Sequence, residues 1–491
     1  MKDEDELMPP RADARQFVAL VVITVATAVA TGHTLRQPAF MTANDISRWC
    51  TVWSLVERGT YVIDECPWQA DTQDKVERSP KGADSAAGGQ AAAKHFYSSK
   101  PAILSTLIAG ILYPARRITG VPLHHVFLQE RAERWTQKPD PDHPGKLKGV
   151  LEKPKEPVKW PAYIFYFKPV LILLNVIPFG IFLVLFARVL DRYAVNDWAW
   201  IFCLIAAAFG TYLLPYTQTL NNHTIGAFSA FFALYQFLRI WDEGELSGWR
   251  FAAAGFFAGF TATTELPALA FPALLGPLLL VRYPRKTLRY FLPAAIVPLA
   301  AFVAAQYVEF GEFYLPYESF GAQEYSYEGS IWQTPLELDA FNKHPEAYGV
   351  YLFHMTFGHH GIFSLTPLFL LSVWGAIRLF RRGGGEPMAA VAGMTAILTV
   401  VLLAFYTWNP KARNYGGSAQ GLRWLFWLIP FWLLMLPKGV EAGQTRLIVR
   451  RLALLALAVS AVSVGYAIRN PWSHPWILDA MEHLNLYPLT R

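Results

Sequence analysis

The chain has 491 residues, of which 53% are hydrophobic and only 16% are charged, and its mean hydropathy is +0.25. Soluble domains carry roughly 25% charged residues, so this composition excludes an ordinary soluble protein and favours a polytopic membrane protein. The net charge of +6 does not indicate nucleic-acid binding, because many basic residues lie in short loops beside apolar runs, where membrane topology requires them.

Apolar runs that reach or approach the ~30 Å thickness of a hydrocarbon layer recur along the chain. They occupy 17–32, 162–187, 196–215, 224–240, 251–283, 288–307, 362–379, 388–407, 421–437 and 451–468, and the run at 251–283 is long enough for two short passes. Short basic loops near 282–289, 378–382 and 446–451 mark the cytoplasmic face. Alternation from these loops predicts about eleven crossings, with the N-terminus inside and the C-terminus outside. The first run follows an acidic segment, so we expect a retained anchor and not a cleaved signal peptide.

Asp45 follows the first apolar run, at a depth where an ionisable side chain is costly unless it has a function. Apolar residues recur at helical spacing from Ala43 to Gly59 and predict a helix that lies flat on the membrane, anchored by tryptophan side chains. Asp45 falls in its first turn, so it is a candidate catalytic base or, alternatively, an N-terminal cap. Arg48, one turn later, would pair with Asp45 or bind an anion.

The three cysteines are too few for a disulfide framework. Cys50 and Cys66 share the first external loop and would pair only if that loop lies in an oxidising compartment. Cys203 lies within an apolar run and is expected to pack there.

A second external helix is predicted where Lys100 precedes Pro101. The alternation of crossings puts both ends of the 101–115 run on one face, so this helix should lie in the interface without crossing. Lys100 is then a cation on the same face as Asp45, suited to a phosphate group. The alternative is a snorkelling interfacial lysine.

Two motifs of this external loop resemble those of a family of membrane glycosyltransferases. Asp-Ile-Ser-Arg-Trp at 45–49 resembles the Asp-Glu-Ala-Arg-Tyr of dolichyl-phosphate-mannose protein mannosyltransferase-like and aminoarabinose-transferase-like enzymes, and Ser-Lys-Pro-Ala-Ile at 99–103 resembles their Lys-Pro-Pro-Leu. The resemblance is strongest over residues 15–118, and the order of the motifs is kept. It implies the GT-C fold, a polyprenyl-phosphate sugar as donor, and a juxtamembrane helix for the second motif. Ile46 stands where the family has a second acid, and Ala102 where it has a second proline; the first difference argues against a metal-dependent, two-carboxylate variant.

The basic, proline-rich segment at 119–160 predicts a flexible external insert. It would serve as a solvated linker or, alternatively, as a patch for anionic lipid or glycan.

Polar residues at three other external positions are candidate substrate-binding groups. Asn222 and His223 open an apolar run, where the alternative role is a helix cap with the histidine satisfied locally. Glu265 separates the two short passes of 251–283, and its alternative role is to cap that hairpin. Arg423 follows a glycine-rich turn that suits close approach to a phosphate or sugar, or else it is a snorkelling arginine beside a simple turn.

His359 and His360 lie at the external end of an apolar run. Neighbouring side chains on a helix point about 100° apart, which is poor geometry for a metal, so we expect these histidines to bind sugar or phosphate.

Together these patterns predict an all-α, polytopic membrane protein, and the resemblance implies that its fold is GT-C. A catalytic module at 1–310, with its first external loop at 34–160, would be followed by an external loop at 311–361 and by C-terminal helices and an external tail at 362–491. The expected activity is inverting transfer of a sugar from a polyprenyl-phosphate carrier to a lipid, glycan or protein acceptor, at the external or periplasmic face of the cell (inner) membrane. No cofactor, divalent metal or nucleic-acid partner is expected. The alternative is a transporter or flippase of a lipid-linked saccharide.

Overall fold

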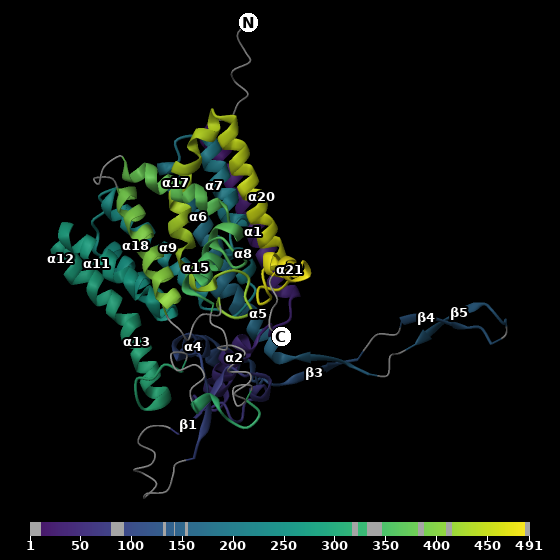
Figure 1. The fold of residues 1–491 in the computed structure, drawn as a ribbon. Coiled ribbons are helices and arrows are strands. Elements are labelled where there is room, and N and C mark those ends of the chain that lie inside the picture. Colours follow the sequence, from purple (N-terminus) through teal and green to yellow (C-terminus); the bar gives the residue numbers. More distant parts are fainter. Residues whose placement is uncertain are drawn as a thin grey trace, which may run out of the picture.

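The computed structural model describes residues 11–79, 93–130, 134–141, 143–152, 156–316, 323–330, 346–381, 387–408 and 415–486. Helices dominate this part of the chain, and most of them form one bundle (Figure 1). The bundle helices are α1 (Arg11–Arg36), α5 (Ala162–Leu171), η2 (Ile172–Val176), α6 (Ile177–Tyr193), α7 (Asp197–Phe209), α8 (Leu213–Tyr216), α9 (His223–Trp241), α10 (Gly248–Thr264), η3 (Leu266–Leu269), α11 (Ala270–Arg282), α12 (Pro284–Lys286), η4 (Thr287–Phe291), α13 (Leu292–Phe310), α15 (Tyr348–Thr356), α16 (Ile362–Leu365), α17 (Leu368–Phe380), α18 (Pro387–Trp408), η8 (Arg423–Leu428), α19 (Ile429–Val440), η9 (Glu441–Gln444), α20 (Leu447–Arg469) and α21 (Trp476–His483).

Seven helical segments of the described chain are long and apolar enough to cross a membrane. They are Ala14–Arg36, Ala162–Tyr193, Asp197–Tyr216, Pro284–Phe310, Pro387–Trp408, Arg423–Gln444 and Leu447–Arg469. The remaining predicted crossings coincide with α9, α10 and two shorter apolar segments, Leu266–Arg282 and Leu368–Phe380. A helical membrane protein is therefore confirmed, whereas the count of eleven crossings stays a prediction.

The bundle packs through small residues where two helix backbones meet. A Cβ atom at Gly255 of α10 would collide with the backbone of Phe291, and one at Gly259 with the backbone of Ala295 in α13. Glycines four residues apart let membrane helices approach this closely. The apolar core joins both halves of the chain, from Ala26 in α1 to residues beyond α20.

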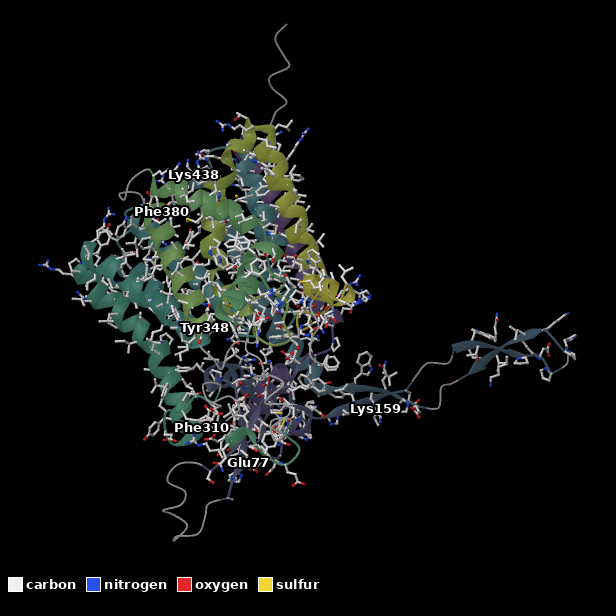
Figure 2. All side chains as sticks on the ribbon, in the orientation of Figure 1. Glu77, Lys159, Phe310, Tyr348, Phe380 and Lys438 are labelled. Carbon is white, nitrogen blue, oxygen red and sulfur yellow. The ribbon has the colours of Figure 1, made fainter. Side chains whose placement is uncertain are left out.

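One end of the bundle carries a compact unit, named the external unit because the sequence predicts that this end is external. It contains α2 (Ala43–Glu57), η1 (Gln69–Asp71), α4 (Ala102–Thr119), η6 (Gln323–Tyr325) and the antiparallel strands β1 (Lys75–Arg78) and β2 (His95–Ser98). Figure 2 labels Glu77 and Phe310 at this end and Phe380 and Lys438 at the opposite end.

Both predicted external helices are present, as α2 and α4. The surroundings of α2 differ from those expected. Thr42 caps α2, since its Oγ1 accepts the backbone N–H groups of Asn44 and Asp45. Trp49 and Trp53 are buried inside the protein, so the expectation that they anchor α2 in the membrane is wrong. In α4, Leu107 and Ile111 are exposed while Ile103, Leu104, Ile108 and Leu112 pack inward, an arrangement suited to an interfacial helix.

The basic segment after α4 is a projecting β arm, not an unstructured linker (Figure 1). Strands β3 (Val126–Gln129) and β6 (Val158–Pro161) pair antiparallel at its base, and β4 (Arg134–Pro139) pairs with β5 (Leu147–Glu152) further out. The sequence prediction of a flexible insert is therefore wrong for the described residues, and the all-α prediction holds only for the membrane bundle. Within β5, Leu147, Gly149 and Leu151 share one face of the two-stranded ladder, and Lys148, Val150 and Glu152 share the other.

Candidate functional site

Five residues predicted as substrate-binding groups form one hydrogen-bonded chain beside the external unit. Arg48 Nη2 donates to Asn222 Oδ1 at 2.7 Å, and Asn222 Nδ2 donates to Glu265 Oε1 at 2.8 Å. His223 Nδ1 bonds the same Glu265 oxygen, and Arg423 Nη1 lies 3.2 Å from His223 Nε2. The chain brings together α2, the start of α9, the break after α10 and η8.

Asn222 can take part in this series of hydrogen bonds because its neighbour, Asn221, caps α9. Asn221 Oδ1 accepts the backbone N–H of Thr224 at 2.9 Å, in the first turn of α9. Asn222 makes no capping bond of its own and donates instead to Thr264 O at 2.7 Å as well as to Glu265. The alternative that Asn222 is a helix cap is therefore wrong.

Glu265 occupies the junction between α10 and η3, as the sequence predicts. It is 7% exposed, and its Oε1 accepts from two side chains, so the buried carboxylate is stabilised by polar contacts. These contacts are all satisfied by a neutral His223 that carries its proton on Nδ1, donates to Glu265 and accepts from Arg423. The alternative of a histidine satisfied locally is wrong, because both of its partners lie far away in sequence.

Asp45 lies in the first turn of α2 and is fully buried. Its Oδ2 accepts the backbone N–H of Met41 at 3.0 Å, and its Oδ1 accepts that of Leu220 at 3.1 Å. Burial raises the pKa of Asp45 to about 7, against the lowering effects of these hydrogen bonds and of the Arg48 guanidinium. Asp45 is therefore not the N-terminal cap, which is Thr42, but a carboxyl whose proton exchanges near neutral pH.

The backbone of Leu220 contacts both Asp45 and Arg48. Its N–H binds the Asp45 carboxyl, and its carbonyl oxygen lies 3.5 Å from Arg48 Nη1. Burial lowers the pKa of Arg48 to about 10, so this guanidinium stays charged at neutral pH. One backbone segment thus covers the acid and contacts the cation.

Lys100 has a partner that the sequence did not suggest. Its Nζ lies 3.2 Å from Asp74 Oδ1, and its backbone N–H binds Ser98 Oγ at 3.1 Å. Burial lowers the pKa of Lys100, Asp74 raises it, and the charges of Arg48 and Arg423 lower it again. Three cations from separate segments therefore lie within electrostatic reach of one another, as expected of an anion site.

A small cavity opens beside the hydrogen-bonded chain. Arg48, Asn222, Thr263 and Thr264 supply its polar wall, and Pro101, Ile103, Leu104 and Phe260 supply its apolar wall. Asp45 is not part of this lining.

His359 and His360 do not join this chain. They lie in the turn between α15 and α16, packed against Tyr415, and their Nδ1 atoms are 2.5 Å apart. Tyr415 and Arg423 belong to one segment, in which Arg423 Nε donates to Gly416 O at 2.9 Å. The two histidines are thus neighbours of the site through this segment.

Three polar residues near the site were missed from the sequence. Asp74 lies in a loop between η1 and β1, where no periodicity marks it. Gln306, one turn before the end of α13, accepts the N–H of Ala102 at 2.9 Å and so fixes the start of α4. Glu309, also in α13, is 3% exposed, and neither of its carboxylate oxygens has a hydrogen-bond partner among the described residues. An acid at the end of an apolar run was the signal for Glu309.

No protein-family model matches the sequence, and no curated protein matches it.

Proposed function

We propose that this chain is an integral-membrane glycosyltransferase of GT-C type, which transfers a sugar from a polyprenyl-phosphate carrier to an acceptor at the external face of the cell membrane. The observation that carries the proposal is the position of Asp45, a buried carboxyl with a pKa of about 7, one helical turn before the guanidinium of Arg48. A base with a pKa near the working pH is the most effective at taking a proton from an acceptor.

In the proposed reaction Asp45 takes the proton of an acceptor hydroxyl or amine. The acceptor oxygen or nitrogen attacks the anomeric carbon, and the bond from that carbon to the phosphate oxygen breaks. A single displacement inverts the configuration at the anomeric carbon. The phosphate leaves with its electron pair, so the proposal needs no strong general acid.

The leaving phosphate would be bound by Arg48, Lys100 and Arg423. Asn222, Glu265 and His223 would act as positioning residues, because they connect the two arginines through hydrogen bonds without adding a net positive charge. Preorganised cations of this kind stabilise the charge that develops on a leaving group. His359 and His360 stay candidate sugar-binding groups outside the connected chain.

Access to Asp45 sets one requirement of the proposal. The Leu220 N–H that binds Asp45 has to give way when an acceptor arrives, and contact of a ligand with Arg48 offers a way to move the same backbone segment. Catalytic hydrogen bonds often form only in the substrate complex, so the bond in the free protein is compatible with a base.

The test uses a deletion strain of the source organism. A detergent-solubilised lipid and envelope extract of that strain supplies unreacted carrier-linked sugar and unmodified acceptor. Purified protein added to this extract should convert the acceptor to a form heavier by one sugar, with loss of the polyprenyl-phosphate sugar, as measured by mass spectrometry. The Asp45→Asn protein should not.

The same experiment separates an enzyme from a flippase, since no membrane remains to be crossed. Restoration of the modification only in intact vesicles, and never in detergent, would favour the transporter and overturn the proposal.

A further inference from the structure

A cluster of histidines lies next to the proposed site, and none of its members takes the acceptor proton or binds the leaving phosphate in the reaction described above. His354, in the last turn of α15, lies close to His359, and their rings stack with centroids 4.1 Å apart. His360 packs at 4.7 Å from His359, and His474 lies 6.4 Å from His360. His354, His359 and His360 are all buried.

One carboxylate completes this cluster. Glu346, just before α15, offers an oxygen that lies within 4.8 Å of one ring nitrogen each of His354 and His359, and the two nitrogens are equally close to each other. The donor atoms around tetrahedral zinc lie about 3.4 Å apart, which follows from bonds of roughly 2.0–2.1 Å. Side-chain rotation would have to bring the three donors to this spacing when an ion binds. Two histidines and one glutamate are a ligand set that binds zinc.

We propose that Glu346, His354 and His359 bind a divalent transition-metal ion of the zinc class. The expectation of poor spacing assumed that His359 and His360 would both bind a metal from one helix. In the structure His359 lies in a turn, and its proposed co-ligands are His354 in α15 and Glu346, which lies two residues before that helix.

His360 takes the supporting role in this arrangement. Its Nδ1 lies 2.5 Å from His359 Nδ1, so His360 can accept the proton of that nitrogen. His359 then keeps a lone pair on Nε2 for the metal. Metal-binding histidines nearly always donate their other ring N–H in this way, which fixes the tautomer and raises basicity.

The ion would tie α15 to the segment that carries Arg423. Glu346 accepts a hydrogen bond from Tyr415 Oη, the His360 ring stacks on Tyr415 at 4.8 Å, and Gly416 binds Arg423. Metal binding would thereby hold one of the three cations of the anion site in place. The proposal does not depend on the glycosyltransferase activity, because metal content is measured directly.

The test starts with the full chain, carrying an affinity tag without histidine and purified in detergent without chelator. Elemental analysis should find about one zinc per chain, in line with a single three-ligand site. His354→Ala and Glu346→Gln should each lose most of it. His95→Ala is the matched control, since His95 also lies beside a carboxylate, Asp64 at 2.7 Å, but without a third ligand among the described residues; this variant should keep the metal.

Two further measurements control for loss of metal during purification and for unfolding of a variant. Chelator-stripped protein titrated with Zn²⁺ should bind it saturably, and His360→Ala should bind about 10- to 100-fold more weakly because only the supporting hydrogen bond is lost. Zinc should raise the thermal unfolding midpoint of wild type and of His95→Ala, but not that of Glu346→Gln. The proposal is overturned if stripped wild type shows no saturable binding, or if the ligand variants bind zinc as tightly as the control.

Discussion

Asp45 is the carboxyl of the site that has only backbone donors as hydrogen-bond partners among the described residues. Glu265 is held by Asn222 and His223, and Asp74 by Lys100, whereas Asp45 accepts only the backbone N–H groups of Met41 and Leu220. Its pKa of about 7 follows from burial that these donors do not offset.

The Asp45→Asn change should lower sugar transfer by about 10²- to 10⁴-fold, because the amide cannot take the acceptor proton. Asparagine has one acceptor oxygen for two backbone donors, so some loss of stability, on the order of 1–3 kcal/mol, should accompany it. Asp64→Asn serves as control, since Asp64 also accepts a backbone N–H, from Phe96 at 2.6 Å, outside the site. Equal activity of both variants in the detergent assay would leave Asp45 a purely structural residue.

The pH dependence of stability gives a second measurement at the same residue. Folding raises the pKa of Asp45 from 3.8 to about 7, so the folded state binds a proton that the unfolded state has lost. The stabilisation linked to that proton is complete below pH 4 and disappears as the pH rises through about 7, and a shift of about three units corresponds to roughly 4 kcal/mol. Activity should change in the opposite direction and rise through pH 7. In Asp45→Asn the unfolding midpoint should fall less between pH 5 and pH 8 than in wild type.

Lys100 and Asp74 have to be tested together because they form an ion pair. Loss of a charge-assisted contact to phosphate, worth roughly 1.5–3 kcal/mol, should weaken inhibition by sugar-free polyprenyl phosphate by one to two decades in Lys100→Ala. Lys100→Arg should keep part of this inhibition. Asp74→Asn frees the lysine without removing its charge, so inhibition should be retained or strengthened. If Asp74→Asn weakens inhibition as much as Lys100→Ala, Lys100 serves only to pair with Asp74.

At the scale of single elements, α4 is expected to lie in the interface of the external face. Gly110 offers a probe, because a Cβ there meets no atom within 4 Å, and the three native cysteines are buried. A membrane-impermeant thiol reagent applied from outside should label Gly110→Cys if its thiol is exposed to water. It should leave the thiol unlabelled if the thiol lies within lipid. Val195→Cys, in the exposed loop before α7, should react only after permeabilisation. Labelling of Gly110→Cys from the cytoplasmic side alone would contradict the assigned topology.

The pair Cys50 and Cys66 tests the compartment of α2. Both thiols are buried, and their sulfur atoms are in contact at 2.6 Å. In an oxidising compartment Cys50 and Cys66 would form a disulfide and lose two protons. Their two electrons would pass to a thiol–disulfide exchange catalyst. Mass spectrometry after denaturing alkylation without reductant should then find Cys203 alkylated and the pair linked. Three alkylated cysteines would place this loop in a reducing compartment.

At the scale of the whole molecule, the positions of the bundle helices could be predicted from the apolar runs, because a hydrocarbon layer requires a similar length and polarity of every helix that crosses it. The meeting of Glu265, His223 and Arg423 could be suspected from their common face but not paired, since contacts between distant segments leave no local pattern. The β arm was missed because its proline-rich turns resemble a linker. The proposed metal site was not predicted, because only the adjacent pair His359 and His360 was considered and no local pattern links Glu346 or His354 to it.

Removal of the β arm should leave the bundle intact. Gln129 pairs directly with Val158 at the base of the arm, so a two-residue Asn-Gly turn can replace 130–157 while β3 and β6 remain. The β3 residues are exposed, and little core would be lost. We expect a monodisperse protein with an unfolding midpoint within a few degrees of wild type, since surface changes are usually worth about 0.5 kcal/mol or less. Aggregation of the shortened chain would show that the arm stabilises the fold.

The glycine contact between α10 and α13 has a consequence for the protein in its lipid environment. α10 ends next to Glu265, and α13 carries Gln306, which fixes the first turn of α4 just after Lys100. Because no side chain separates the two backbones at Gly255 and Gly259, neither helix can tilt without the other. A thinner or thicker bilayer changes helix tilt. Glu265 and Lys100 should therefore move together. The distance between them should not change with the thickness of the surrounding membrane.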